Sequence, residues 1–240
     1  MSPSYHAKAD RQPADRGLAL IGALLFANTV ALALVGLVVP PDVAGCGFEK
    51  AILCAEMPPS GSALTALLMA APNTLAQWRL SIWLDMPFLL LYGALLAGSA
   101  RSLAAAPGWL VRVAVAGAVA GVLFDVAENI GILVAAHEPR VVTDGLASLI
   151  DSFAHAKFAL LGVSCAALAG LALSKRREGP WEAVLVIVGG FVALVCGLVG
   201  LAMPRVVEVG ALGIAVACAG LWWRAIRRAF PRSREESSLP

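Results

Sequence analysis

Six long apolar stretches decide what kind of protein this chain can form. They are residues 18–39, 75–99, 109–136, 146–174, 181–203 and 206–226. Each has about 20 residues or more, the length that an α-helix needs to cross the hydrocarbon core of a bilayer. Hydrophobic residues make up 60% of the chain and charged residues only 14%, which excludes an ordinary soluble domain. We therefore predict an all-α, multi-pass membrane bundle of six transmembrane helices.

The positions of Lys and Arg predict how this bundle is oriented. With six spans, the basic residues at both ends of the chain fall on one side, together with the cluster at 175–177. The opposite side carries few basic residues, among them Lys50, Arg140 and Arg205. Cytoplasmic loops are enriched in Lys and Arg, so both termini are predicted to be cytoplasmic and the chain to lie in the cell membrane. The net charge of +2 follows this topology and forms no basic face, so we expect the lipid bilayer as partner and no nucleic acid.

The sequence outside the spans is short. The expected organisation is a disordered cytoplasmic tail at 1–16, a transmembrane domain at 17–229 and a basic, polar cytoplasmic tail at 230–240. The tails are polar, and the N-terminal one contains prolines. No soluble domain is therefore expected.

The longest connection is the outer loop 40–74. Cys46 and Cys54 lie in it, and we predict a disulfide between them because an outward loop faces an oxidising compartment. Its apolar part, 61–71, is too short to span and is expected to lie along the outer interface or to dip inward. A lid over a site and an ordered outer cap are both suitable roles for so long a loop.

Acidic and amide side chains interrupt the third predicted span. Asp125, Glu128 and Asn129 are spaced i, i+3 and i+4, so they project from one helix face. Gly117 and Gly121 continue the same line and favour the close approach of another helix. An acidic residue near the middle of a spanning helix costs roughly 2.5–3.5 kcal/mol on insertion scales. Both carboxyl groups are therefore expected to face the interior of the bundle.

The second and fourth spans carry polar faces of their own. Ser81, Asp85 and Tyr92 follow one face of the second span, with Pro87 two residues after the acid. The polar face of the fourth span consists of Ser148, Asp151, Ser152 and His155, and Lys157 projects from a different face of that helix. At a rise of 1.5 Å per residue, one set of polar residues from the three spans lies about 10–16 Å below the outer ends of their helices, namely Asp85, Asp125, Glu128, Asn129, His155 and Lys157. The sequence therefore predicts one polar site between the outer interface and the midplane.

These residues suggest roles at such a site. The candidate catalytic residues are Asp85, Asp125, Glu128, Asn129 and Lys157, and the candidate substrate-binding residues are Tyr92, Ser81, Ser148 and His155. The preferred hypothesis is a membrane protein that handles a lipid or small amphiphile on the outer-leaflet side by acid–base or metal-assisted chemistry. Whether the chain is an enzyme is left open.

Two chemistries are compatible with the preferred hypothesis. In the first, a divalent metal activates a water molecule to hydrolyse an ester, amide or phosphate of a lipid. Its candidate ligands are Asp85, Asp125, Glu128, Asp151 and His155. In the second, Lys157 neutralises Asp125 or Glu128, and another carboxyl group stays protonated as a general acid, which suits an olefin-bearing lipid. The identity of any cofactor is left open.

Two other protein classes remain as alternatives. The carboxylates could carry protons in a proton-coupled small-molecule transporter. The polar groups could also serve only as interhelical hydrogen bonds in a structural membrane subunit, where such bonds contribute about 0.6 kcal/mol on average.

Part of this pattern resembles a known group. The motif residues are Trp83-Leu84-Asp85, Tyr92, Phe124-Asp125, Glu128-Asn129, Ala147-Ser148 and Lys157. Their order resembles a pattern in a group of uncharacterised bacterial multi-pass membrane proteins, over the second to fourth spans only. The resemblance implies that Asp85, Asp125, Glu128, Asn129 and Lys157 act as a set, and it implies no particular activity. His155 has no counterpart in that pattern, which weakens the metal hypothesis.

Overall fold

The computed structural model describes residues 12–36, 51–70, 74–103, 108–174, 180–199 and 206–230. The helices are α2 (Gln12–Gly36), α3 (Ala51–Glu56), α4 (Gly61–Leu68), α5 (Thr74–Ser102), α6 (Gly108–His137), the 3-10 helix η1 (Pro139–Val141), α7 (Asp144–Ser174), α8 (Pro180–Val199) and α9 (Val206–Ala229). These ranges contain no strand. The predicted all-α fold is therefore confirmed.

Five of the helices are long and apolar enough to cross a membrane, namely α2, α5, α6, α7 and α9. The apolar part of α8 is shorter, at Pro180–Cys196. A helix thus occurs at each of the six predicted ranges, and the chain is a multi-pass membrane protein. The count of six crossings and the location in the cell membrane stay predictions.

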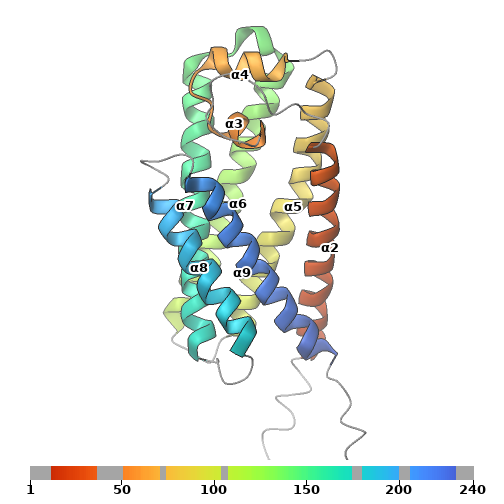
Figure 1. The fold of residues 1–240 in the computed structure, drawn as a ribbon, viewed down its shortest axis with the longest axis vertical. Helices are drawn as coiled ribbons and strands as arrows, with labels where there is room; N and C mark the ends of the chain where they lie inside the picture. The colour runs from red at the N-terminus through yellow and green to blue at the C-terminus, as the bar shows by residue number, and fades with distance from the viewer. Residues whose placement is uncertain are drawn as a thin grey trace, which may run out of the picture.

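The spanning helices form a bundle in which neighbours in sequence are mostly neighbours in space (Figure 1). α6 packs along α7, α7 along α8 and α8 along α9, while α2 packs on both α5 and α9. α2 begins and α9 ends at the same end of the bundle, and a cytoplasmic position for that end remains a prediction. α2 begins at Gln12, so its first residues fall within the predicted tail, where buried Asp15 accepts a hydrogen bond from Ser102 Oγ at 3.3 Å.

Small residues set the spacing between α6 and α7. A Cβ atom on Gly117 would lie 2.9 Å from the carbonyl oxygen of Leu160, and one on Gly121 would lie 2.8 Å from Leu161 Cδ2. Larger side chains at these positions would push the helices apart. The predicted glycine strip therefore faces α7 and brings the acidic residues of α6 close to it.

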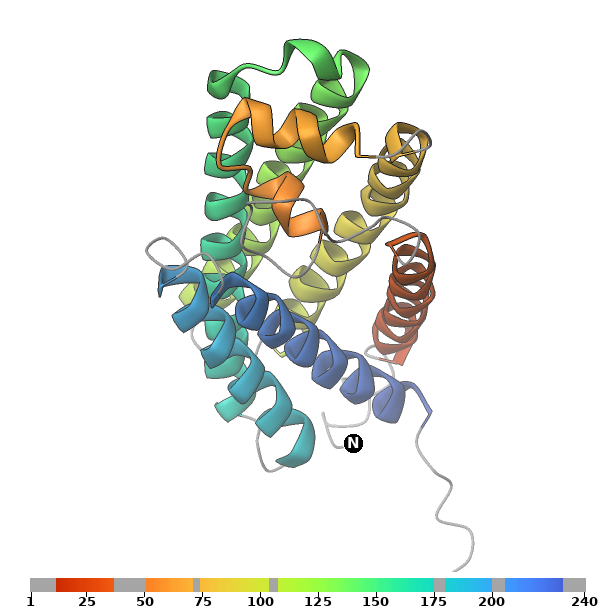
Figure 2. The same ribbon diagram turned by 45° about the horizontal axis from the view of Figure 1, so that its top comes forward.

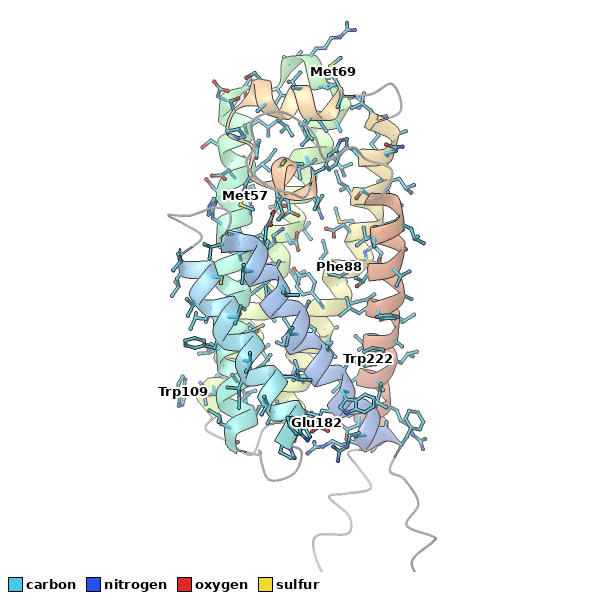
Figure 3. The ribbon with its side chains drawn as sticks, in the orientation of Figure 1. Met57, Met69, Phe88, Trp109, Glu182 and Trp222 are labelled. Atoms are coloured by element: carbon cyan, nitrogen blue, oxygen red, sulfur yellow. The ribbon has the colours of Figure 1, made fainter. Side chains whose placement is uncertain are left out.

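The described part of the outer loop, residues 51–70, folds against the other end of the bundle (Figure 2). We call this part the inserted segment, and we call the end of the bundle that carries α4 and η1 the α4 end. α4 lies across the helix ends, and α3 lies deeper between the spanning helices. In Figure 3, Met69 accordingly lies at the α4 end and Met57 well below it.

Hydrogen bonds hold the inserted segment in place. Ser60 caps α4 by accepting a hydrogen bond from Ala63 N at 3.1 Å. Gly61 N donates to Asp144 Oδ1 at 2.8 Å, and Thr65 Oγ1 donates to the carbonyl oxygen of Pro139 at 2.8 Å. The described part of the apolar stretch 61–71 thus forms α4, which lies across the helix ends, and the inward position is taken instead by α3, for which no position had been predicted.

The hairpin of α8 and α9 extends only to about the level of α3 (Figure 1). Beyond it, the inserted segment fills the bundle with apolar side chains, among them Leu53, Leu64 and Leu68, all buried. Val207, at the start of α9, belongs to the same apolar cluster. Cys54 is buried in α3, whereas Cys46 lies outside the described residues, so their disulfide stays a prediction.

Candidate functional site

The main polar site lies on the side of α3 that faces away from the α4 end, and Lys157 of α7 is at its centre. Lys157 Nζ lies 3.2 Å from Asp125 Oδ1 and 2.9 Å from Glu128 Oε2, both on α6. A third carboxylate comes from the inserted segment, with Glu56 Oε2 3.1 Å from the same nitrogen. The side chain of Lys157 is 5% exposed and that of Glu128 is 0% exposed. We call these four residues the carboxylate–lysine cluster, in which one ammonium faces three carboxyl groups.

Local sequence explains why the cluster forms between α6 and α7. The i, i+3 spacing of Asp125 and Glu128 places both carboxyl groups on the face that the glycine strip turns toward α7. Gly121 lies one turn before Asp125 and lets the backbones approach. Lys157 then reaches both carboxylates, and its Nζ also lies 4.9 Å from the ring centroid of Phe158.

Two short hydrogen bonds join this site to α5. Tyr92 donates its hydroxyl proton to Asp125 Oδ2 at 2.6 Å. Asn129 Nδ2 donates to Asp85 Oδ2 at 2.6 Å, in a partly buried position. The ring of Phe88 packs edge-on against Tyr92, with centroids 5.5 Å apart. The five candidate catalytic residues and Tyr92 are therefore brought together on three helices, whereas their roles in any reaction stay predictions.

Other residues predicted for the site lie apart from it. His155 Nδ1 lies 2.8 Å from the carbonyl oxygen of Asp151 and 3.3 Å from its Oδ1. Ser152 Oγ donates to the carbonyl oxygen of Ser148 at 2.7 Å, and Ser148 is exposed. These contacts run within α7, on a face other than that of Lys157. Ser81 is half-buried on α5, one turn before Asp85.

The five candidate metal ligands do not form one set. Among the described residues, no group of three or more His, Cys, Asp or Glu side chains is placed to hold a metal ion. Asp125 and Glu128 contact Lys157, Asp85 contacts Asn129, and Asp151 contacts His155 on another face of α7. The predicted ligand set is therefore not assembled, because the helical period turns Asp151 and His155 away from Lys157.

Glu56 was not among the site residues predicted from the sequence. The available signal was its isolation, since it is the single charge in the apolar run 51–57 that precedes Pro58 and Pro59. Burial raises the pKa of the Glu56 carboxyl above its ordinary value, although the Lys157 ammonium opposes this shift.

A separate polar network lies at the opposite end of the bundle. Glu182 of α8 is buried and accepts a hydrogen bond from Arg227 Nη1 of α9 at 2.6 Å. Trp222 Nε1 of α9 donates to the carbonyl oxygen of Ala19 in α2 at 3.0 Å. Figure 3 places Glu182 and Trp222 there, far from Met57. This network joins helices and is unconnected to the carboxylate–lysine cluster.

Comparison with known proteins identifies no relative of this chain. No family model matches the sequence, and searches of curated proteins and of solved structures give no match. Interpretation of the site therefore depends on its geometry and charge.

Proposed function

We propose that this membrane protein handles a lipid or small amphiphile from the outer leaflet and uses the carboxylate–lysine cluster to donate and accept protons. The observation that carries this proposal is the contact of one buried ammonium, Lys157, with Glu56, Asp125 and Glu128 at 2.9–3.2 Å.

The charge balance of the cluster is the first argument. Three ionised carboxylates beside one ammonium would leave two negative charges uncompensated where little water is present. Burying an uncompensated charge is strongly unfavourable, so at least one carboxyl group holds a proton. The raised pKa of Glu56 makes that residue a suitable proton holder. A protonated carboxyl beside an ionised one is the arrangement that general acid–base catalysis requires.

The position of the cluster is the second argument. Asp125 and Glu128 lie nine to twelve residues before His137, the end of α6, or roughly 14–18 Å along the helix. If the α4 end faces outward, this depth lies within the outer half of the bilayer. Glu56 reaches the cluster on α3, which is too short to span, so it can move without disrupting a spanning helix. Such movement would open the cluster to an amphiphile and remove one carboxylate at the same time.

A proton-coupled small-molecule transporter is the second candidate. The same excess of carboxyl groups over ammonium groups favours it, because intramembrane acids that exchange protons are typical of such carriers. In this case Glu56 would act as an outer gate. The two candidates differ in whether a bound molecule is changed or moved.

The proposal is tested by identifying what the purified protein binds. We expect the full-length protein, extracted from its membrane, to carry an amphiphile enriched over the bulk lipid, detected by mass spectrometry. Glu128→Gln and Asp125→Asn should lose it. Glu182→Gln is the matched control, because it also neutralises a buried carboxylate paired with a cation, at the other end of the bundle.

Three outcomes separate the candidates. Retention of the amphiphile by both cluster variants would overturn the proposal and leave a structural role for the cluster. Loss from Glu182→Gln as well would indicate general destabilisation. For the transporter, proton-dependent uptake into proteoliposomes should vanish when Asp125 and Glu128 are both neutralised, and unchanged uptake in that double variant would rule this candidate out.

A further inference from the structure

We infer that a lateral groove between α5 and α6 at the α4 end is a second binding site, which takes one zwitterionic phospholipid. The groove has a volume of about 660 Å³, within the range of roughly 300–1,000 Å³ that is usual for small-molecule sites. None of its lining residues belongs to the carboxylate–lysine cluster. This inference requires only that the chain spans a membrane, so it stands or falls separately from the proposed function.

The lining of the groove changes from polar to apolar along the bundle. Arg79 of α5 and His137 and Glu138 at the end of α6 form its polar rim. Trp83 of α5 and Ile130 of α6 line its deeper part. Along α5, Trp83 lies roughly 6 Å from Arg79, and along α6, Ile130 lies roughly 10 Å from His137. A phospholipid has the same order of polarity, with its headgroup at the interface and its acyl chains toward the midplane.

The apolar part of the groove is open to the surroundings of the bundle. Trp83, Ile130 and Val134 are each more than half exposed, although they lie on helices long and apolar enough to span. Side chains of this kind on a spanning helix face lipid. The natural occupant of the deeper part is therefore an acyl chain.

The charges of the rim select the headgroup. Arg79 Nη2 donates to the carbonyl oxygen of Ala136 at 2.9 Å, which fixes the guanidinium beside the end of α6. A guanidinium has five N–H donors in a planar fork, so it can bind a phosphate as well. Glu138 supplies a negative charge on the same rim. The pair matches a phosphate and an ammonium within one headgroup, whereas a purely anionic headgroup would be repelled by Glu138.

Native mass spectrometry of the full-length protein tests this site with phospholipids that share acyl chains and differ in headgroup. The probes are phosphatidylethanolamine, phosphatidylcholine and phosphatidylglycerol. We expect one zwitterionic lipid to bind several-fold more tightly than phosphatidylglycerol. Arg79→Gln should weaken this binding about tenfold, and Arg79→Lys should retain part of it. Glu138→Gln should remove the discrimination against phosphatidylglycerol.

Arg140→Gln is the matched control, because Arg140 is an exposed cation of η1 that does not line the groove. It should leave binding unchanged. Equal binding of all headgroups, insensitive to both Arg79→Gln and Glu138→Gln, would mean non-specific lipid only and would overturn the inference. Tighter binding of phosphatidylglycerol by the unmodified protein would overturn it too. Neither outcome depends on variants of the carboxylate–lysine cluster.

Discussion

Lys157 Nζ of α7 lies 2.9 Å from Glu128 Oε2 of α6, and the Glu128 side chain has no solvent exposure. This contact joins two spanning helices through charges that lie far from either end. Removing one partner of a buried ion pair leaves the other charge uncompensated, which is usually more destabilising than removing both. The energetics of the site can therefore be tested one charge at a time.

Lys157→Met should destabilise the protein by about 3–5 kcal/mol, because Glu56, Asp125 and Glu128 would lose their shared counter-charge. Thermal unfolding in detergent measures this as a lower Tm. The double variant Lys157→Met, Glu128→Gln should recover part of the loss, since it removes one uncompensated acid. A Tm equal to that of the unmodified protein would contradict a buried, charged cluster.

Glu56 should make the stability of the inserted segment depend on pH. An acid whose pKa is higher in the folded state stabilises the fold while protonated, and this contribution is lost as the pH rises through that pKa. Because burial raises the pKa of Glu56, the Tm of the unmodified protein should fall relative to that of Glu56→Gln as the pH is raised above the ordinary Glu range of about 4.3. A pH-independent difference between the two proteins would show that Glu56 does not titrate differently on folding.

Tyr92→Phe should destabilise the protein by about 1 kcal/mol, because it removes one buried hydrogen bond to Asp125 and little volume. A double-mutant cycle with Asp125→Ala isolates this bond, because Ala has no side-chain acceptor for the Tyr92 hydroxyl. Strictly additive effects of the two substitutions would indicate that the 2.6 Å contact contributes nothing to stability.

Gly117→Val should separate α6 from α7 and destabilise the bundle by about 1–3 kcal/mol, since a Cβ atom there would meet the Leu160 carbonyl oxygen at 2.9 Å. The control is Gly108→Ala at the start of α6, where a Cβ atom would meet nothing within 4 Å. Gly117→Val should also release any amphiphile held by the cluster. If both variants unfold at the same temperature as the unmodified protein, the spacing between the helices does not depend on this glycine.

The helical period explains how much of this site could be predicted from the sequence. It placed Asp125, Glu128 and Asn129 on one face and separated Lys157 from Asp151, and the structure has these arrangements. The rise per residue placed Asp85 at the depth of Asn129, to which it is hydrogen-bonded. Both quantities depend only on local geometry, which a regular helix preserves along its whole length.

Features set by tertiary contacts could not be predicted in this way. Glu56 lies in a connection with no regular period, so nothing local indicates that its carboxylate reaches Lys157. Trp side chains near the end of a spanning helix are typical of the membrane interface, yet of the two in α5, Trp78 is buried against the inserted segment and Trp83 is exposed. The apolar stretch of α8 is shorter than those of the five long helices, and α8 and α9 accordingly extend only part of the way along the bundle.

Two of the contacts that hold the inserted segment are made by α7. Asp144 accepts the hydrogen bond from Gly61 at the start of α4, and Lys157 attracts Glu56 at the end of α3. Thirteen residues, or about 20 Å of helix, separate the two points on α7. Glu56 and Gly61 stand on either side of the connection between α3 and α4, so a tilt or slide of α7 would displace this connection from both of its sides at once.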